Sequence, residues 1–209
     1  MRSLILFLWL APLNLLAQYN NFTEVSDISG FKKKFNEESA KIKSISSNFE
    51  QEKELTILLE KIISKGEFRF KRENKIRIEY LDPFYYLMII NGDKMIIKDD
   101  QNETTMNVRS NKLFQQVNNI MVESVNGTII DNEDFSVRIF EDASRYLMEM
   151  TPVDKTLKGF FNTILIYADK ESFSVTQILM NESSGDTTLI KFVNRNLNAQ
   201  LSDEIFTLN

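Results

Sequence analysis

The chain has 209 residues, with 25 lysines and arginines against 30 aspartates and glutamates, and it contains neither histidine nor cysteine. Without these two residue types, Ser-His-Asp and Cys-His catalysis, histidine–zinc centres and disulfides are all excluded. The mild net charge of −5, with no segment that concentrates basic residues, argues against binding to a nucleic-acid backbone. These absences argue against an enzyme, and packing alone must hold the fold. The chain has no Walker motif, and we expect it to need no nucleotide or metal.

Residues 1–17 have the pattern of an export signal. A positive charge near the start is followed by an apolar run, and the small residue Ala17 precedes the expected cleavage at Gln18. The apolar run is too short for a good membrane span. Gln18 also stands where a bacterial lipoprotein would have its lipidated cysteine. We expect a mature protein of residues 18–209 that is one domain, soluble in the periplasm, and not itself lipidated.

The first predicted element is an amphipathic helix that begins at Ile28. Ser26 or Asp27 can cap its start. Apolar residues then recur at helical spacing as far as Ile45, with lysines and glutamates between them. This spacing predicts about five helical turns. The lysine run at 32–34 is typical of a solvated helix face.

A strand is expected next, with Phe49 and Gln51 on one face. The segment from Leu55 to Ile63 is apolar without a break, so periodicity does not decide between strand and helix. We favour a strand that turns at Lys65-Gly66 into the stretch that follows.

The stretch from Gly66 to Ile97 is the most regular part of the chain and is predicted to form three strands and a hairpin return. Alternation with period two places every second residue on one apolar face. The pair Asn91-Gly92 between two apolar runs is the strongest short signal for a hairpin. The residues expected to line an apolar cavity are Phe49, Phe68, Phe70, Ile76, Ile78, Tyr80, Met88, Ile90, Met95 and Ile97.

Arg72 shares its predicted strand face with Phe68 and Phe70. One interpretation is an arginine at the end of a strand that extends its charged group to water. The other is a single hydrogen-bond donor inside an apolar cavity. The residues alone leave both open.

These motifs also resemble a known family. The order G-x-F-x-F-x-R ending at Arg72, a short turn, a charged and aliphatic strand, Pro83 and then an Asn-Gly turn is similar to the LolA outer-membrane lipoprotein carrier family. The Phe49 and Gln51 pair resembles the family's S-F-x-Q strand. Glu73 stands where the family usually has a proline. The resemblance extends over nearly the whole mature chain.

Beyond Lys98 a polar turn and a short strand precede a second predicted helix, which ends at Asn126-Gly127. Its apolar stripe includes Phe114, Val117 and Met121. Such a stripe is usually ordinary core, but its methionine and phenylalanine would also suit a movable lid over an apolar ligand. A further short helix or turn is expected between Asn126 and Glu133.

The remainder is predicted to be an antiparallel meander, because short alternating runs are separated by turn residues. The runs are Phe135 to Phe140, Arg145 to Thr151, Thr163 to Ala168, Phe173 to Met180, Thr187 to Val193 and Ile205 to Leu208. Together with the earlier elements they predict an α+β fold, a strongly curved antiparallel sheet of about 10–12 strands that forms an incomplete half β-barrel. The N-terminal helix and the lid helix are expected to cover it.

The resemblance implies a monomeric periplasmic chaperone that binds the acyl chains of lipoproteins. It would receive them from an inner-membrane ABC-type lipoprotein-releasing complex and carry them towards an outer-membrane acceptor. It also implies that Arg72 bonds the backbone carbonyls of a helical lid and holds the empty form shut. Three alternatives remain open: a carrier of other lipids or glycolipids in a specialised envelope pathway, an envelope-stress sensor that binds a signalling protein, and an enzyme acting on lipids.

Overall fold

The computed structural model describes residues 19–208 except Asn20 and Asn111, and it leaves the side chains of residues 112–114 and 117 undescribed. The predicted export signal at residues 1–17 lies outside this range. Every helix and strand discussed below is formed by residues from Thr23 onwards. In the described part of the chain, no helix combines the length and the apolar character needed to cross a membrane.

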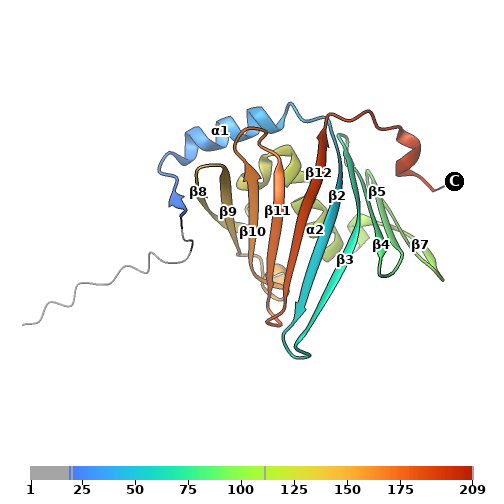
Figure 1. The fold of residues 1–209 in the computed structure, drawn as a ribbon. Coiled ribbons are helices and arrows are strands. Elements are labelled where there is room, and N and C mark those ends of the chain that lie inside the picture. The colour runs from blue at the N-terminus through green and yellow to red at the C-terminus, as the bar shows by residue number, and fades with distance from the viewer. Residues whose placement is uncertain (1–18, 20, 111, 209) are drawn as a thin grey trace, which may run out of the picture.

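One antiparallel sheet of 12 strands organises the molecule, and it is open because its two end strands do not pair (Figure 1). The spatial order is β1-β8-β9-β10-β11-β12-β2-β3-β4-β5-β6-β7. The predicted α+β fold with a curved, unclosed sheet is confirmed. The strands are β1 (Thr23–Glu24), β2 (Ser44–Leu55), β3 (Glu60–Lys71), β4 (Lys75–Asp82), β5 (Tyr86–Asn91), β6 (Lys94–Asp99), β7 (Glu103–Asn107), β8 (Phe135–Glu141), β9 (Arg145–Pro152), β10 (Phe161–Asp169), β11 (Val175–Glu182) and β12 (Thr187–Leu197).

Helix α1 (Ile28–Ser39) begins where the sequence predicts but is shorter than predicted. The side chain of Asp27 caps it by accepting a hydrogen bond of 2.9 Å from the backbone N–H of Gly30. The prediction that the helix continues to Ile45 is wrong. Strand β2 already begins at Ser44, because it pairs with β3 from Ser44 and with β12 from Ile45. This pairing outweighs the helical spacing of the apolar residues.

The prediction of a strand over Leu55 to Ile63 with a turn at Lys65-Gly66 is also wrong in its boundaries. Strand β2 ends at Leu55, residues 56–59 form the turn, and β3 runs without a break through Gly66. Gly66 is needed for close packing and not for a turn. A Cβ atom at Gly66 would lie 2.7 Å from the ring of Phe49, its partner across the strand pair.

Helix α2 (Lys112–Asn126) and the short 3₁₀ segment η2 (Thr128–Asp131) confirm the two predictions made for this region. Gly127 between them has φ +82°, the left-handed conformation that glycine adopts at low cost. The predicted strand over Ile205 to Leu208 is wrong: residues Asp203–Phe206 form a 3₁₀ turn, η3. Strand β1, the 3₁₀ turn η1 (Val108–Ser110) and the four-residue helix α3 (Lys155–Lys158) were not predicted.

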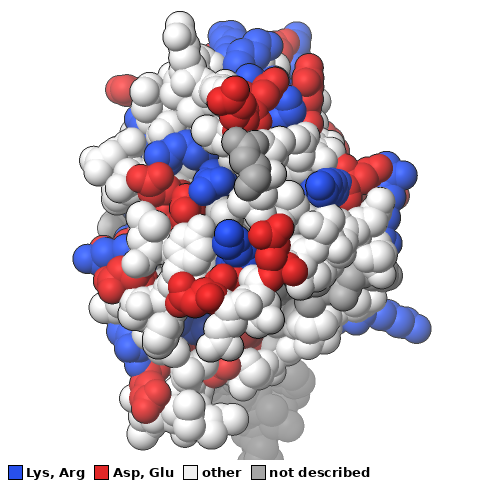
Figure 2. All heavy atoms as spheres, turned by 90° about the vertical axis from the view of Figure 1, so that its right-hand side faces the viewer, with Lys and Arg blue, Asp and Glu red and all other residues white. Residues whose placement is uncertain are grey.

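The two faces of the sheet are covered differently. Helices α1 and α2 pack on one face, which we call the helix-covered face. The other, the outer face, is covered at its two sides by the chain's terminal segments. Phe206 packs on Leu87 and Ile89 of β5. Tyr19 and Phe22 pack beside β8, β9 and β10. Basic and acidic side chains are interspersed over the side of the molecule shown in Figure 2.

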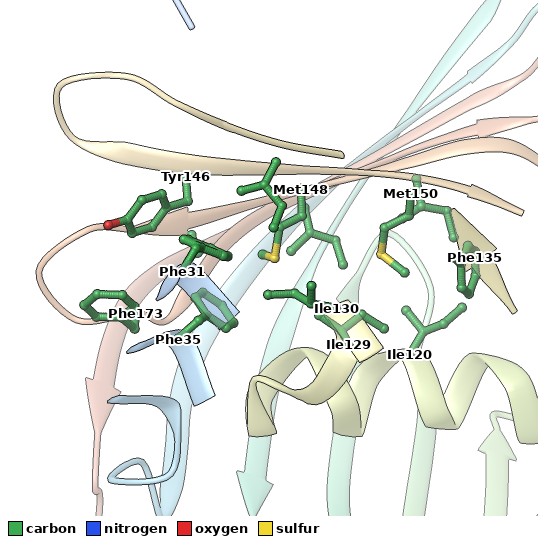
Figure 3. Packing of buried hydrophobic residues seen from close by; sticks show 14 of the residues in the cluster. Phe31, Phe35, Ile120, Ile129, Ile130, Phe135, Tyr146, Met148, Met150 and Phe173 are labelled. Atoms are coloured by element: carbon green, nitrogen blue, oxygen red, sulfur yellow. The ribbon is translucent and has the colours of Figure 1, made fainter. Parts of the chain in front are cut away.

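The helix-covered face has two hydrophobic clusters. The cluster under α1, which we call the filled half, joins Phe31 and Phe35 of α1 to Met148 and Met150 of β9 and to residues of η2 (Figure 3). Phe31 stacks on Phe35 with 5.4 Å between ring centroids. The cluster under α2, the cavity half, is formed mainly by β2 to β6.

Candidate functional site: an apolar cavity beneath helix α2

A cavity of about 90 Å³ lies between α2 and the middle of the sheet. It is smaller than the ~150 Å³ engineered cavity that takes up a benzene molecule. Its walls come from strands and one helix, and most of its lining is apolar. The lining residues are Ile45, Ser47, Phe49, Phe68, Ile78, Tyr80, Met121, Ser124, Val125, Val175, Ile178, Ile190, Phe192 and Arg195.

Strand register explains why these side chains meet. Ser47 of β2 lies opposite Phe68 of β3, and Phe68 lies opposite Ile78 of β4. On the other side of β2, Phe49 lies opposite Phe192 of β12. Because directly opposed residues in an antiparallel sheet point to the same face, these rows of side chains form one continuous floor under α2.

Aromatic contacts give the floor its shape. The ring of Phe49 meets that of Tyr80 edge-on at 4.9 Å, and Phe68 lies 5.2 Å from Phe192. The hydroxyl of Tyr80 donates a hydrogen bond of 2.9 Å to Gln51 Oε1. Burial raises the pKa of Tyr80 to about 12, so this group is a neutral phenol at physiological pH.

Two serine hydroxyls line the cavity, and they differ in their bonding. Ser124 Oγ donates to the carbonyl of Ile120, one turn earlier in α2, at 2.5 Å. Ser47 is 1% exposed, and its Oγ has no hydrogen-bond partner among the described residues. A buried hydroxyl without a partner costs stability. Ser47 is therefore the hydroxyl that a ligand could satisfy.

Arg195 brings a positive charge to the cavity wall because of a β-bulge. Val193 pairs with Asn48 and Asn196 with Ser46, so two residues of β12, including Asn194 with φ +54°, stand against Ser47 alone. A bulge shifts the alternation by one residue. Arg195 consequently points to the helix-covered face, and in a regular strand it would point to the outer face.

The guanidinium of Arg195 is only partly bonded. Its Nη1 donates to Ser174 Oγ and, at 3.4 Å each, to the carbonyls of Ser174 and Val175. Its Nε and Nη2 have no hydrogen-bond partner in the described part of the chain. Burial lowers the pKa of Arg195, and the carboxylate of Asp169 acts in the opposite direction. The group stays charged, since arginine is not deprotonated in proteins.

Arg72 lies outside this cavity, at the end of α1. Its Nε donates to the carbonyl of Ile42 at 2.7 Å and its Nη2 to that of Ser39 at 2.9 Å. A cation at a helix C-terminus also interacts favourably with the helix dipole. The acceptors therefore belong to α1 and the turn after it, whereas the resemblance implied that Arg72 would bond carbonyls of the lid helix. Ser39 itself packs closely against Gly127 at the end of α2: a Cβ atom added at Gly127 would lie only 2.7 Å from Ser39 Cβ.

A family model described as outer membrane lipoprotein carrier protein LolA matches residues 40–209. This match covers all the strands that line the cavity. The chain belongs to the LolA family. No curated protein matches the chain.

Solved structures resemble this LolA-family chain at low sequence identity. An uncharacterised conserved protein from Thermus thermophilus is 8% identical, with a TM-score of 0.53 over 85% of this chain and 91% of that one. The MucA/MucB complex structure from Pseudomonas aeruginosa gives 14% identity and a TM-score of 0.50 over 88% of this chain, which spans 62% of that chain. A LolA superfamily protein from Nitrosomonas europaea gives 13% identity and a TM-score of 0.46, covering 85% of this chain and 97% of that one.

In this LolA-family chain, five of the predicted ligand-binding residues line the cavity: Phe49, Phe68, Ile78, Tyr80 and Met121. The others of the central stretch belong to the same hydrophobic cluster but not to the lining: Phe70, Ile76, Met88, Ile90, Met95 and Ile97. Phe114 and Val117 are part of α2, but their side chains lie outside the described structure.

The sequence analysis missed the wall contributed by β11 and β12. The alternation of Ile190 and Phe192 was visible in the sequence, but nothing there showed that β12 pairs with β2. Ser47 continues the alternation of Phe49 and could have been found in that way. Arg195 could not, because its orientation depends on the bulge.

Proposed function

We propose that this protein is an exported carrier that binds the acyl chains of lipoproteins between helix α2 and the sheet. The observation that carries this proposal is the apolar cavity under α2, in a member of the LolA family. Its wall includes Arg195 and the hydroxyl of Ser47, which has no partner among the described residues. The protein would take its cargo from an inner-membrane ABC-type releasing complex and deliver it towards the outer membrane.

The energetic need for such a carrier comes from the cargo. Each methylene of an acyl chain exposed to water costs ~0.8 kcal/mol, so a lipoprotein that crosses an aqueous compartment needs an apolar container. The cavity of about 90 Å³ describes a closed form. Cargo must therefore displace α2 from the sheet. Met121, on the α2 side of the cavity, has the flexible side chain that can adapt to chains of different shape.

The polar groups on the cavity wall give the cargo an orientation. An acyl chain of a lipoprotein ends in an ester or amide carbonyl, which is a hydrogen-bond acceptor. Ser47 Oγ and the Nε and Nη2 groups of Arg195, which have no partner among the described residues, are donors on neighbouring strands. We assign them to the carbonyl end of the chain, with the aromatic floor holding its methylenes.

Arg72 is assigned to the junction of the two helices. Its hydrogen bonds fix the carbonyl end of α1, on which Gly127 at the end of α2 packs. Displacing α2 would loosen this contact, so the cost of opening would keep the affinity for cargo moderate and allow release.

The test is native mass spectrometry of residues 18–209, with a synthetic triacylated peptide added without detergent. The wild type is expected to take up the peptide, and Arg195→Met to lose at least ~10-fold in affinity because a charged hydrogen bond is removed. Lys191→Met is the matched control, since Lys191 lies on the same strand but faces Glu52 on the outer face.

Two outcomes would contradict the proposal. No uptake of acylated peptide by the wild type would remove the carrier function. Equal binding of the peptide with and without its acyl chains would favour the alternative of a sensor that binds a signalling protein.

A further inference from the structure

The hairpin between β2 and β3 ends in three exposed apolar residues. Ile57 is 86% exposed, Leu58 62% and Leu59 93%. This hairpin extends beyond the neighbouring strands at the lower edge of the sheet in Figure 1. We call residues 56–59 the hairpin tip. Large apolar side chains exposed together normally mark a site of interaction.

The hairpin tip is a costly way to make a turn. Leu59 has φ +52°, a left-handed conformation that asparagine and glycine adopt far more readily than leucine. Its side chain is almost entirely in water, so it contributes no core packing in return. Local propensity and burial would both favour a polar turn residue here, and the fold gains nothing from a leucine.

The backbone of the hairpin tip is nevertheless well fixed. The N–H of Thr56 donates to Asp186 Oδ1 at 3.0 Å and its hydroxyl to the carbonyl of Gly185 at 2.6 Å, both in the turn between β11 and β12. The N–H of Leu58 donates to the carbonyl of Leu55 at 3.2 Å. A tip that is braced in this way holds its apolar side chains away from the rest of the protein.

Most of the charges behind the hairpin tip form ion pairs, but the exposed Glu60, which directly follows the tip, forms none among the described residues. Lys61 lies 2.5 Å from Glu52 and 3.5 Å from Glu54. Lys65 lies 3.9 Å from Glu50. Beyond Lys61, two further apolar residues are partly exposed: Ile62 and Ile63, at 41% and 48%, on opposite faces of β3. The hairpin therefore has an apolar end, and the charged residues behind this end have no net excess of positive charge.

We propose that the hairpin tip inserts into the hydrocarbon boundary of a lipid bilayer. A groove in a partner protein would cover only one side of the hairpin. The apolar side chains here are exposed around the whole turn and on both faces of the hairpin. A fluid environment such as lipid can contact them from all sides. Because the charged residues behind the tip have no excess of positive charge, insertion needs no anionic lipid. This inference does not depend on the cargo of the cavity.

The experiment is flotation of residues 18–209 with large unilamellar vesicles of phosphatidylcholine, with and without about one-fifth phosphatidylglycerol as the anionic lipid. The wild type is expected to bind both kinds of vesicle, and high salt should not release it. The double variant Leu58→Ser/Leu59→Asn is expected to lose at least ~10-fold in partitioning, since two large apolar side chains no longer leave water. Asparagine suits the φ of position 59, so the variant keeps the turn.

The matched control is Ile28→Ser, because Ile28 is an exposed apolar residue, at 38%, at the start of α1 and away from the hairpin. It should bind vesicles like the wild type. Equal partitioning of the hairpin variant and the wild type, or no vesicle binding by the wild type, would overturn the proposal. The proposal would also be overturned if the wild type bound only anionic vesicles and high salt released it. A dimer detected by sedimentation in the wild type and absent in the hairpin variant would overturn it as well. The hairpin variant should still take up acylated peptide, which separates this test from that of the carrier function.

Discussion

In the filled half of the helix-covered face, phenylalanines and methionines occupy the space between α1 and the sheet, and Phe35, Met148 and Met150 are all 0% exposed. In the cavity half, α2 covers side chains that leave about 90 Å³ empty. The wall there includes the partly bonded Arg195 and the hydroxyl of Ser47, which has no partner in the described part of the chain. The same sheet thus carries one region packed for stability and one that is incompletely packed.

The difference indicates how the work is divided between the two helices. Helix α1 is fixed by stacked rings and by Arg72 at its end, so it can serve as a stationary support. Helix α2 covers the cavity with smaller and more adaptable residues such as Met121 and Val125. Four predictions test this division, and they are given in order of decreasing effect.

Phe35→Ala should destabilise the protein by ~3–5 kcal/mol, because it leaves a void in a fully buried site. Phe192→Ala, in the cavity half, should cost less because Phe192 is only partly buried and already borders empty space. Urea unfolding followed by circular dichroism would measure both. Equal losses at the two positions would contradict the comparison.

Arg72→Leu should cost ~2–3 kcal/mol, since the carbonyls of Ser39 and Ile42 both lose a charged donor. Arg109→Leu is the control: Arg109 is 70% exposed and pairs with Asp93, so its loss should have little effect. If the junction of the helices restrains α2, Arg72→Leu should also retain acylated peptide more firmly in native mass spectrometry. Faster release would argue against that role.

Ser47→Ala should leave stability unchanged or raise it by up to ~1 kcal/mol, because it removes a buried hydroxyl that has no partner among the described residues. Ser124→Ala should instead lose a little stability, since that hydroxyl donates to Ile120. Thermal unfolding of the two variants gives the comparison. A clear loss in Ser47→Ala would show that the hydroxyl is already satisfied.

Glu123→Gln tests the pH dependence of α2. Burial raises the pKa of Glu123 above its ordinary value of 4.5, although a hydrogen bond from Asn132 acts against this shift. A carboxyl whose pKa is raised by folding favours the folded state at low pH and loses that contribution as pH rises from the ordinary to the raised value. Glu123→Gln should therefore gain melting temperature relative to the wild type as pH rises through that window. A difference in melting temperature between the two proteins that stays constant with pH would contradict the raised pKa of Glu123.

The sequence predicted the strands β3 to β6 of the cavity half better than the cavity wall formed by β11 and β12. The strands from Phe68 to Met95 follow a period of two because one face of each is buried, and local pattern is enough to find them. Gly127 likewise marks the end of α2 by its own backbone requirement. The prediction of a carrier function and of a role for Arg72 came from the family resemblance and not from these patterns.

The features that could not be predicted depend on pairing between distant parts of the chain. Ile42 and Ile45 have helical spacing with Phe35, but strand pairing assigns Ile45 to β2. Nothing local shows that Asn194 starts a bulge that turns Arg195 inwards. The turn at residues 56–59 lacks the glycine, asparagine or proline that usually marks one. That departure from turn chemistry coincides with the proposed contact with lipid, as expected where function overrides local preference.

The place of β12 in the sheet has a consequence for how the molecule is made. It pairs with β2, which lies near the other end of the described chain, and joins the two halves of the sheet at its middle. Until β12 has joined the sheet, each half presents an open edge and the cavity lacks a wall. Pairing at such long separation is slow to form. The binding site therefore closes only after β12, the last strand in the described part of the chain, has paired with β2.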